Sequence, residues 1–142
     1  MRLKDRKSIK YMAISLMLLF SLNAGNFALA ANTDSIQPMY VGVVSLFPHV
    51  KVTSAGLVVC TDTVTLKNGY SADVTWELNY GAGGNFSNRS TWTASGSRNI
   101  SLYKERYAVR GYSYQLKTSA KVYDSSKNYV ETVVKYSPVV SY

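Results

Sequence analysis

The sequence predicts an all-β protein that folds as a single antiparallel β-sandwich after a cleaved secretory signal peptide. Polar and apolar residues alternate with period two in several runs of the chain, which is typical of half-buried strands. Short segments rich in Gly, Asn, Asp and Ser separate these runs, as expected for turns. Several short strands at such spacing favour a sandwich or barrel.

Residues 1–30 have the layout of a secretory signal peptide. Five basic residues precede an apolar run of about ten residues, and the small-x-small motif Ala28-Leu29-Ala30 follows it. The run is shorter than the ~20 apolar residues that cross a bilayer. We therefore predict cleavage after Ala30, a single mature domain over residues 31–142 without an integral membrane segment, and secretion of the protein.

About seven to eight strands are predicted. In residues 72–80 every even position is apolar and every odd one polar, so Trp76 points into the core. Residues 112–122 repeat this alternation, and residues 56–66 follow it except at Asp62. Residues 129–136 are predicted to place Val130, Thr132, Val134 and Tyr136 inward. Shorter strands are predicted at 39–46, 50–53, 90–94 and 99–103, and a solvated turn at 104–110.

The composition excludes several function classes. Residues 1–30 hold five of the 16 basic and one of the eight acidic residues, which leaves a net charge of +4 in residues 31–142. That mild charge favours weak attraction to anionic walls or membranes and does not indicate nucleic-acid binding. A single Cys and a single His allow no intrachain disulfide, no Cys-based zinc site and no multi-His metal centre. We therefore predict no metal site and no cofactor.

The residues also offer no catalytic constellation. Asp73 and Glu77 share the outward face of one strand at a spacing of ~13 Å, beyond the roughly 5–9.5 Å of glycosidase carboxylates. His49 and Cys60 are a conceivable thiol dyad, but Cys60 falls on the inward phase of its strand and is expected to be a buried, unreactive residue. The sequence thus favours a protein without enzymatic activity.

Exposed aromatic side chains beside polar residues are the strongest indication of a binding function. Rigid rings supply contact area at low entropic cost, which suits a sugar platform or a protein contact. The alternative is that Tyr is simply a good strand former. A basic cluster at 104–110 is suited to phosphate or an anionic polymer, although such clusters are usually solvated turns. The candidate ligand-facing residues are Trp92, Tyr103, Tyr123, Tyr129, Phe86 and Arg110.

The order of features resembles an immunoglobulin-like β-sandwich. Cys60 lies on the second long strand and Trp76 on the third, as in antibody domains, where a second Cys completes a disulfide across the buried Trp. Leu116 stands at the position of that second Cys, so the resemblance implies a packed Cys–Trp–Leu core without a disulfide. Tyr114 matches the tyrosine-corner position two residues earlier.

A second resemblance concerns a family of small secreted proteins of Gram-positive gut bacteria, classed as a domain of unknown function. It is carried by residues 37–41 and 56–60, by Trp92, by the motif 111–114, by residues 122–125, by Glu131 and by residues 135–137. These are mostly core and turn residues, so the resemblance implies fold and secretion but no activity.

Together these observations predict a secreted, non-enzymatic β-sandwich module for extracellular or cell-surface binding. Its partner is expected to be a glycan or a surface protein. The alternative is a secreted, bacteriocin-like effector that acts on the envelope of a competitor, because small size, a secretion signal and positive charge fit both.

Overall fold

The computed structural model describes residues 39–142, so the predicted signal peptide and its cleavage site lie outside the described residues. The described residues form one compact unit. It is all-β and consists of two antiparallel sheets, which confirms the predicted fold class. No helix in residues 39–142 is long and apolar enough to cross a membrane.

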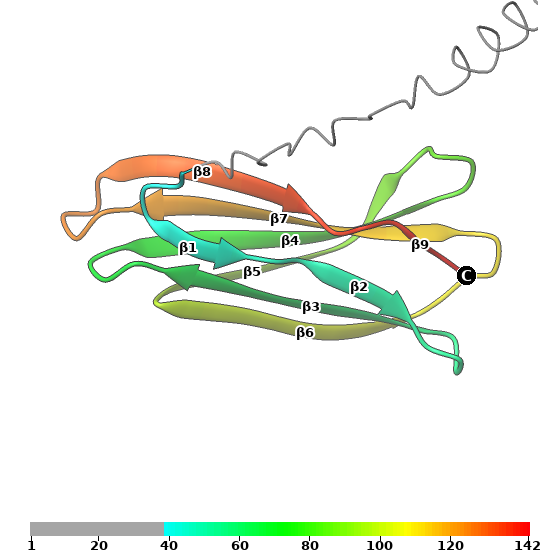
Figure 1. The fold of residues 1–142 in the computed structure, drawn as a ribbon. Coiled ribbons are helices and arrows are strands. Elements are labelled where there is room, and N and C mark those ends of the chain that lie inside the picture. The colour runs from blue at the N-terminus through cyan, green and yellow to red at the C-terminus, as the bar shows by residue number, and fades with distance from the viewer. Residues whose placement is uncertain (1–38) are drawn as a thin grey trace, which may run out of the picture. The chain divides into compact units, whose positions relative to one another are not determined.

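The described chain contains nine strands, one or two more than predicted, and the strand without a predicted counterpart is the two-residue β9 at residues 140–141. The sheets are stacked face to face (Figure 1). In the first sheet β3 lies between β6 and the pair β1 and β2, and in the second the order is β5-β4-β7-β8, with β9 also on β7. The strands are β1 (Val43–Leu46), β2 (His49–Val52), β3 (Leu57–Leu66), β4 (Ser71–Gly81), β5 (Ser87–Ser97), β6 (Asn99–Tyr107), β7 (Ser113–Tyr123), β8 (Tyr129–Tyr136) and β9 (Val140–Ser141).

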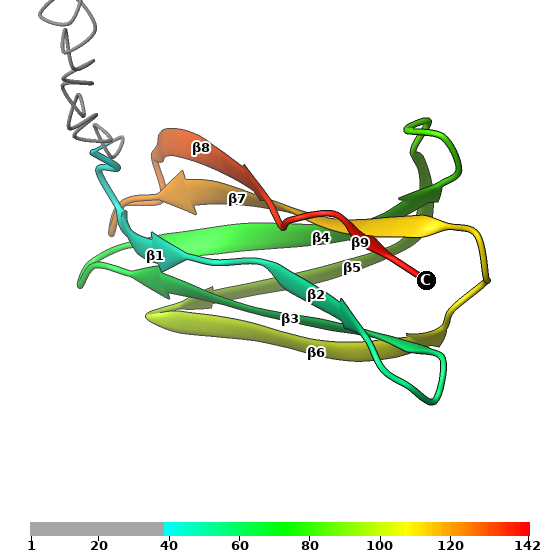
Figure 2. The same cartoon turned by 45° about the vertical axis from the view of Figure 1, so that its right-hand side comes forward.

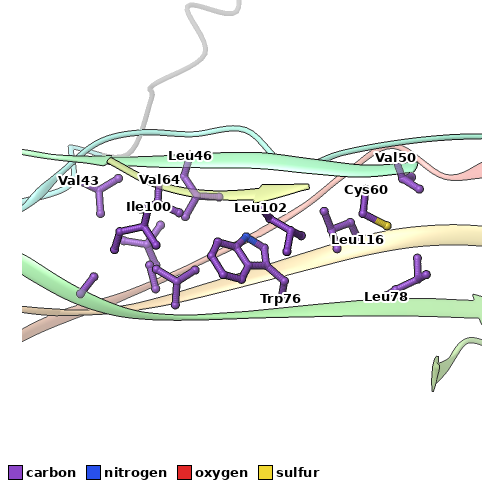
Figure 3. Close-up of a cluster of buried hydrophobic side chains, with 14 of the residues drawn as sticks. Val43, Leu46, Val50, Cys60, Val64, Trp76, Leu78, Ile100, Leu102 and Leu116 are labelled. Atoms are coloured by element: carbon purple, nitrogen blue, oxygen red, sulfur yellow. The ribbon is translucent and has the colours of Figure 1, made fainter. Parts of the chain in front are cut away.

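The core fills the space between the two sheets. Side chains on the inward phase of β3, β4 and β7 are almost completely buried, as the alternation predicts. Trp76 is 1% exposed, and Cys60 and Leu116 are fully buried with it, which confirms the expected Cys–Trp–Leu core (Figure 3). The core therefore holds its two sheets together by packing rather than by a disulfide.

One strand departs from the constant-type immunoglobulin topology. In that topology the strand after the Trp-bearing strand joins the opposite sheet. Here β5 pairs with β4 along its whole length, so it extends the sheet that contains Trp76 (Figure 2). As a result, β5 and β6 are the two edge strands on one flank of the sandwich.

Tyr114 forms the expected tyrosine corner. Its phenolic oxygen accepts a hydrogen bond from the backbone N–H of Val109 at 2.6 Å and approaches the carbonyl of the same residue at 3.4 Å. This contact ties the start of β7 to the loop that precedes it.

Asp62, which interrupts the alternation of its strand, nevertheless points into the core and is only 5% exposed. Its Oδ2 accepts hydrogen bonds from Trp76 Nε1 at 2.9 Å and from Thr118 Oγ1 at 2.6 Å. Trp76 and Thr118 belong to the opposite sheet, so Asp62 links the two sheets through polar contacts in the middle of the core. Its Oδ1 is buried without a protein partner.

The predicted phase of β8 is wrong. Val133 is buried, whereas Val134 and Tyr136 are exposed. The strand contains two adjacent valines, so alternation alone fits either phase, and the phase observed turns Glu131 and Lys135 inward. Both charges lie at the open flank beside β1, where Glu131 accepts hydrogen bonds from two backbone N–H groups, those of Val41 and Gly42. Lys135 lies over the rings of Tyr40 and Phe47.

The predicted turn at 104–110 is also largely wrong, because its first four residues belong to β6. They pair with residues 57–60 of β3 in continuous antiparallel register. At the edge of a sheet, basic side chains can remain in water while the backbone completes the hydrogen bonds to the neighbouring strand. A polar sequence that suggests a turn is therefore also compatible with an edge strand.

Candidate functional site

A shallow hollow of about 410 Å³ lies at one end of the β5-β4-β7-β8 sheet. The start of β4, the end of β5, the end of β7 and the turn between β7 and β8 converge there. Antiparallel register brings these segments together, because Ser71 of β4 faces Ser97 on one side and Tyr123 on the other. Its lining consists of Ser71, Ala72, Asp73, Ser95, Gly96, Ser97, Tyr123 and Lys127.

The walls of the hollow carry both hydrogen-bond donors and acceptors. Ser95 Oγ donates to Asp73 Oδ1 at 2.6 Å, and Lys127 Nζ donates to Ser71 Oγ at 3.2 Å. These contacts leave a second carboxylate oxygen on Asp73, further N–H donors on Lys127 and the hydroxyl of Ser97 available to a ligand. A polar ligand with its own hydroxyl groups suits such a lining.

The turn between β7 and β8 presents Lys127 in a fixed conformation. Asp124 Oδ1 accepts hydrogen bonds from the backbone N–H groups of Ser126 and Asn128, each at 2.9 Å. These hydrogen bonds hold the pKa of Asp124 below its usual range, and the bond from the Asn128 backbone has the largest effect. Lys127 itself has a left-handed φ of 66°, which this carboxylate-capped turn supports.

Tyr123 in the lining of the hollow and its strand partner Tyr129 share one cation. Tyr123 is partly buried and lines the hollow, while Tyr129, on the neighbouring strand, is 57% exposed. The ammonium group of Lys121 lies 5.6 Å from the centre of the Tyr123 ring and 5.7 Å from that of Tyr129. This cation–π contact holds both rings at the same end of the sheet.

The outer face continues away from the hollow as a polar surface. Glu77 and Lys117, on adjacent strands, form an ion pair at 2.6 Å. The Lys117 ammonium holds the pKa of Glu77 below its usual range, and the same contact raises the pKa of Lys117. The pair therefore contributes to stability at neutral pH and loses its contribution as pH falls through the lowered pKa of Glu77. As a surface pair it is worth roughly 0.2–1 kcal/mol.

The structure brings together only two of the six predicted ligand-facing residues, Tyr123 and Tyr129. Tyr103 is exposed on the outer face of the opposite sheet, where its hydroxyl donates to Glu105 at 2.6 Å. Phe86 lies in the loop between β4 and β5 and is 37% exposed. Arg110 is in the loop before β7, beside the ring of Tyr142.

Trp92 lies on the inward phase of β5, directly opposite Trp76, and is partly buried against the core. Its ring is covered by the guanidinium of Arg106 at 5.2 Å. Trp92 is therefore separate from the hollow and belongs to the flank between β5 and β6.

Sequence reasoning missed the serines and Lys127 of the hollow. Their only sequence signal is the outward phase of Ser71, Ser95 and Ser97 in their strands, which many solvated residues share. What makes them a site is the pairing of β4 with β5 and β7, and that register depends on segments up to about fifty residues apart in the chain.

The two catalytic possibilities weighed from the sequence are separated by the fold. His49 is exposed on the outer phase of β2, whereas Cys60 is fully buried on the inner phase of β3. Asp73 and Glu77 each contact other side chains, Ser95 and Lys117 respectively. Within residues 39–142, no three His, Cys, Asp or Glu side chains gather in a way that would hold a metal ion.

Burial also determines the reactivity of Cys60. Desolvation raises the pKa of its thiol to about 11, although nearby Arg106 partly opposes this shift. Since the thiolate is the reactive form, the raised pKa keeps Cys60 in its unreactive thiol form near neutral pH. We expect labelling by a thiol reagent to be slow in the native protein and complete within minutes in denaturant. Fast labelling of the native protein would contradict the buried position of Cys60.

Neither a family model nor a curated protein sequence matches this chain.

Proposed function

We propose that the protein is a secreted, non-enzymatic module that binds an extracellular glycan through the hollow at the end of the β5-β4-β7-β8 sheet. The observation that carries this proposal is the composition of the lining, which combines three serine hydroxyls, a carboxylate and an ammonium group with a tyrosine. The secretory layout of residues 1–30 and the resemblance to small secreted bacterial proteins support the extracellular location.

Sugars need this combination of groups. Each sugar hydroxyl both donates and accepts hydrogen bonds, and Asp73, Lys127 and the serines offer both kinds of partner. The C–H face of a pyranose ring packs well on an aromatic ring, a role that Tyr123 is placed to fill. The volume of about 410 Å³ is within the usual range of roughly 300–1,000 Å³ for small-ligand sites.

The site is also rigid enough to recognise a ligand. Asp73, Ser95 and Tyr123 project from paired strands, and the Asp124 carboxylate fixes the turn that carries Lys127. Groups held in place before binding lose little entropy when the ligand arrives. The hollow is open on one side, so it suits one or two residues of a longer glycan chain.

A glycan array probed with the purified protein tests the proposal, followed by calorimetry on the glycans it retains. Tyr123→Ala and Asp73→Asn are each expected to weaken binding tenfold or more, because they remove the stacking face and a charged acceptor. Tyr103→Ala is the matched control, since this tyrosine is 65% exposed on the opposite sheet. We expect the Tyr103→Ala variant to bind glycan with the affinity of the wild type.

Thermal unfolding of all three variants accompanies the binding measurements, because a folded variant is needed for the comparison. The proposal is wrong if no glycan is retained, or if both hollow variants bind as well as the Tyr103→Ala control. If the protein instead binds a surface protein that carries no glycan, the partner is a protein. That result would also overturn the glycan proposal.

A further inference from the structure

A second surface, on the flank between β5 and β6, has a different chemistry from the hollow. These two edge strands come from different sheets and follow each other through a tight turn at Arg98, which has a φ of 72° (Figure 1). Near that turn their inward positions are filled by apolar side chains such as Ala94, Ile100 and Leu102. Farther along, the inward positions become basic and aromatic. We call Arg89, Lys104, Arg106 and Trp92 the basic flank.

Aromatic rings hold both arginines of the basic flank. The Arg106 guanidinium carbon lies 5.2 Å from the centre of the Trp92 ring, and Arg106 also contacts Ser90 Oγ at 3.4 Å. Arg89 lies 5.2 Å from the Tyr80 ring and 5.9 Å from the Tyr114 ring. Arg106 Nη1 donates to the backbone carbonyl of Glu105 at 2.9 Å, and Arg89 Nη1 donates to Tyr114 Oη at 3.3 Å. Because a guanidinium has five N–H donors and stacking uses only its flat face, each arginine keeps further in-plane N–H groups for an anion.

No carboxylate pairs with these charges in residues 39–142. The ion pair found there joins Lys117 to Glu77 on the other sheet face. The remaining carboxylates are engaged elsewhere: Asp62 in the core, Asp73 in the hollow, Glu105 with Tyr103, Asp124 in its turn and Glu131 with backbone N–H groups. The basic flank therefore has three cationic groups and no counter-charge from the described chain.

The need to protect exposed sheet edges explains only part of the positive charge on the basic flank. Charged residues at sheet edges prevent strands of other molecules from pairing there, and the exposed Lys104 fits that role. Arg89 is partly buried between two tyrosines, with Tyr114 Oη as an uncharged partner at 3.3 Å. Holding a charge partly out of water without a counter-ion is unfavourable, so its position indicates an anionic ligand.

We infer that the basic flank binds a linear polymer of phosphate groups that carries no nucleobases. Lys104 and Arg106 are two residues apart on one strand and so project on the same side, ~7 Å from each other, along the direction of an extended chain. A phosphate offers several acceptor oxygens, so one group can bond an arginine fork and a second cation together. This site goes beyond the proposed glycan site, from which it is separate in both residues and chemistry.

Long-chain inorganic polyphosphate is the probe, and tryptophan fluorescence is the readout. Trp76 is 1% exposed and Trp92 is partly exposed, so a fluorescence change on binding reports the basic flank. We expect Arg106→Gln to weaken binding tenfold or more and to lower the magnitude of the slope of log K against log salt by about one. Arg106→Lys keeps the positive charge but loses the planar set of N–H donors of the guanidinium. We therefore expect its affinity to lie between those of Arg106→Gln and the wild type.

Lys51→Gln is the matched control, because it removes one exposed charge from β2, away from the basic flank. We expect less than a twofold loss for this variant, and no loss for Tyr123→Ala in the hollow. Equal losses for Arg106→Gln and Lys51→Gln would overturn the inference, because binding would then follow net charge alone.

Two further outcomes would also overturn it. If Arg106→Gln binds polyphosphate normally but self-associates in size-exclusion chromatography, the basic flank serves edge protection. If single-stranded DNA of matched charge binds more tightly than polyphosphate, the flank recognises bases and the occupant is a nucleic acid. Failure of the glycan array leaves these results unaffected, so the two proposals are tested separately.

Discussion

Replacing Trp76 with Ala is expected to lower the free energy of unfolding by about 3–5 kcal/mol, the usual range for a buried aromatic side chain. The indole is 1% exposed and lies between the sheets near Leu102 and Leu116, so its removal leaves a cavity in the centre of the core (Figure 3). It also removes one of the two donors to Asp62. Urea denaturation followed by circular dichroism measures the loss.

Trp76→Phe separates packing from hydrogen bonding in this experiment. The phenyl ring keeps most of the apolar volume but has no N–H for Asp62, so we expect an intermediate loss. A domain of this size has only ~5–15 kcal/mol of stability, and Trp76→Ala is therefore expected to be partly unfolded at 37 °C. A loss below about 1 kcal/mol for Trp76→Ala would show that the ring is not in the core.

Replacing Asp62 with Ala is expected to cost about 2–4 kcal/mol, because it leaves two buried donors, Trp76 Nε1 and Thr118 Oγ1, without an acceptor. The size of the side chain contributes less, since the lost volume is small. Asp62→Asn retains an oxygen of the same shape that can accept both hydrogen bonds. We expect this variant to be much closer to the wild type in the same urea titration.

A double variant tests whether the contact itself is responsible. In a cycle with Asp62→Ala and Thr118→Val, the two losses are expected to be less than additive, because both remove the same 2.6 Å hydrogen bond. Additive losses would mean that Asp62 stabilises the fold through groups other than Thr118. An Asp62→Ala variant as stable as the wild type would contradict the role of the carboxylate in linking the sheets.

The central strands were predictable from the sequence because alternation is a local property. Each of β3, β4 and β7 has one face on the core, so its burial pattern appears directly in its residues, and the positions of Trp76 and Tyr114 follow. Edge strands lack this clear contrast. In β8 the inward Glu131 finds its partners in the segment before β1, about ninety residues away in the chain, so no local pattern indicates its phase.

The candidate sites were only partly predictable for the same reason. The aromatic residues are visible in the sequence, but their neighbours are set by strand register. Tyr123 and Lys127 meet Asp73 and Ser95 because β4 lies between β5 and β7, and Trp92 meets Arg106 because β5 joins the sheet of β4. Predicting Asp62 as a polar link between sheets would require knowing that Thr118, 56 residues later, faces it.

The order of the strands has a consequence for how the protein reaches its native state. β3 pairs with β6 across two strands of the other sheet, and β4 pairs with β7 across β5 and β6, so neither sheet is formed from a continuous segment of chain. Loop-closure entropy must be overcome before any of these long-range contacts is gained, which places such domains among the slow folders, at milliseconds to seconds. The same interleaving makes half of the sandwich unstable by itself, so unfolding should be an all-or-none transition.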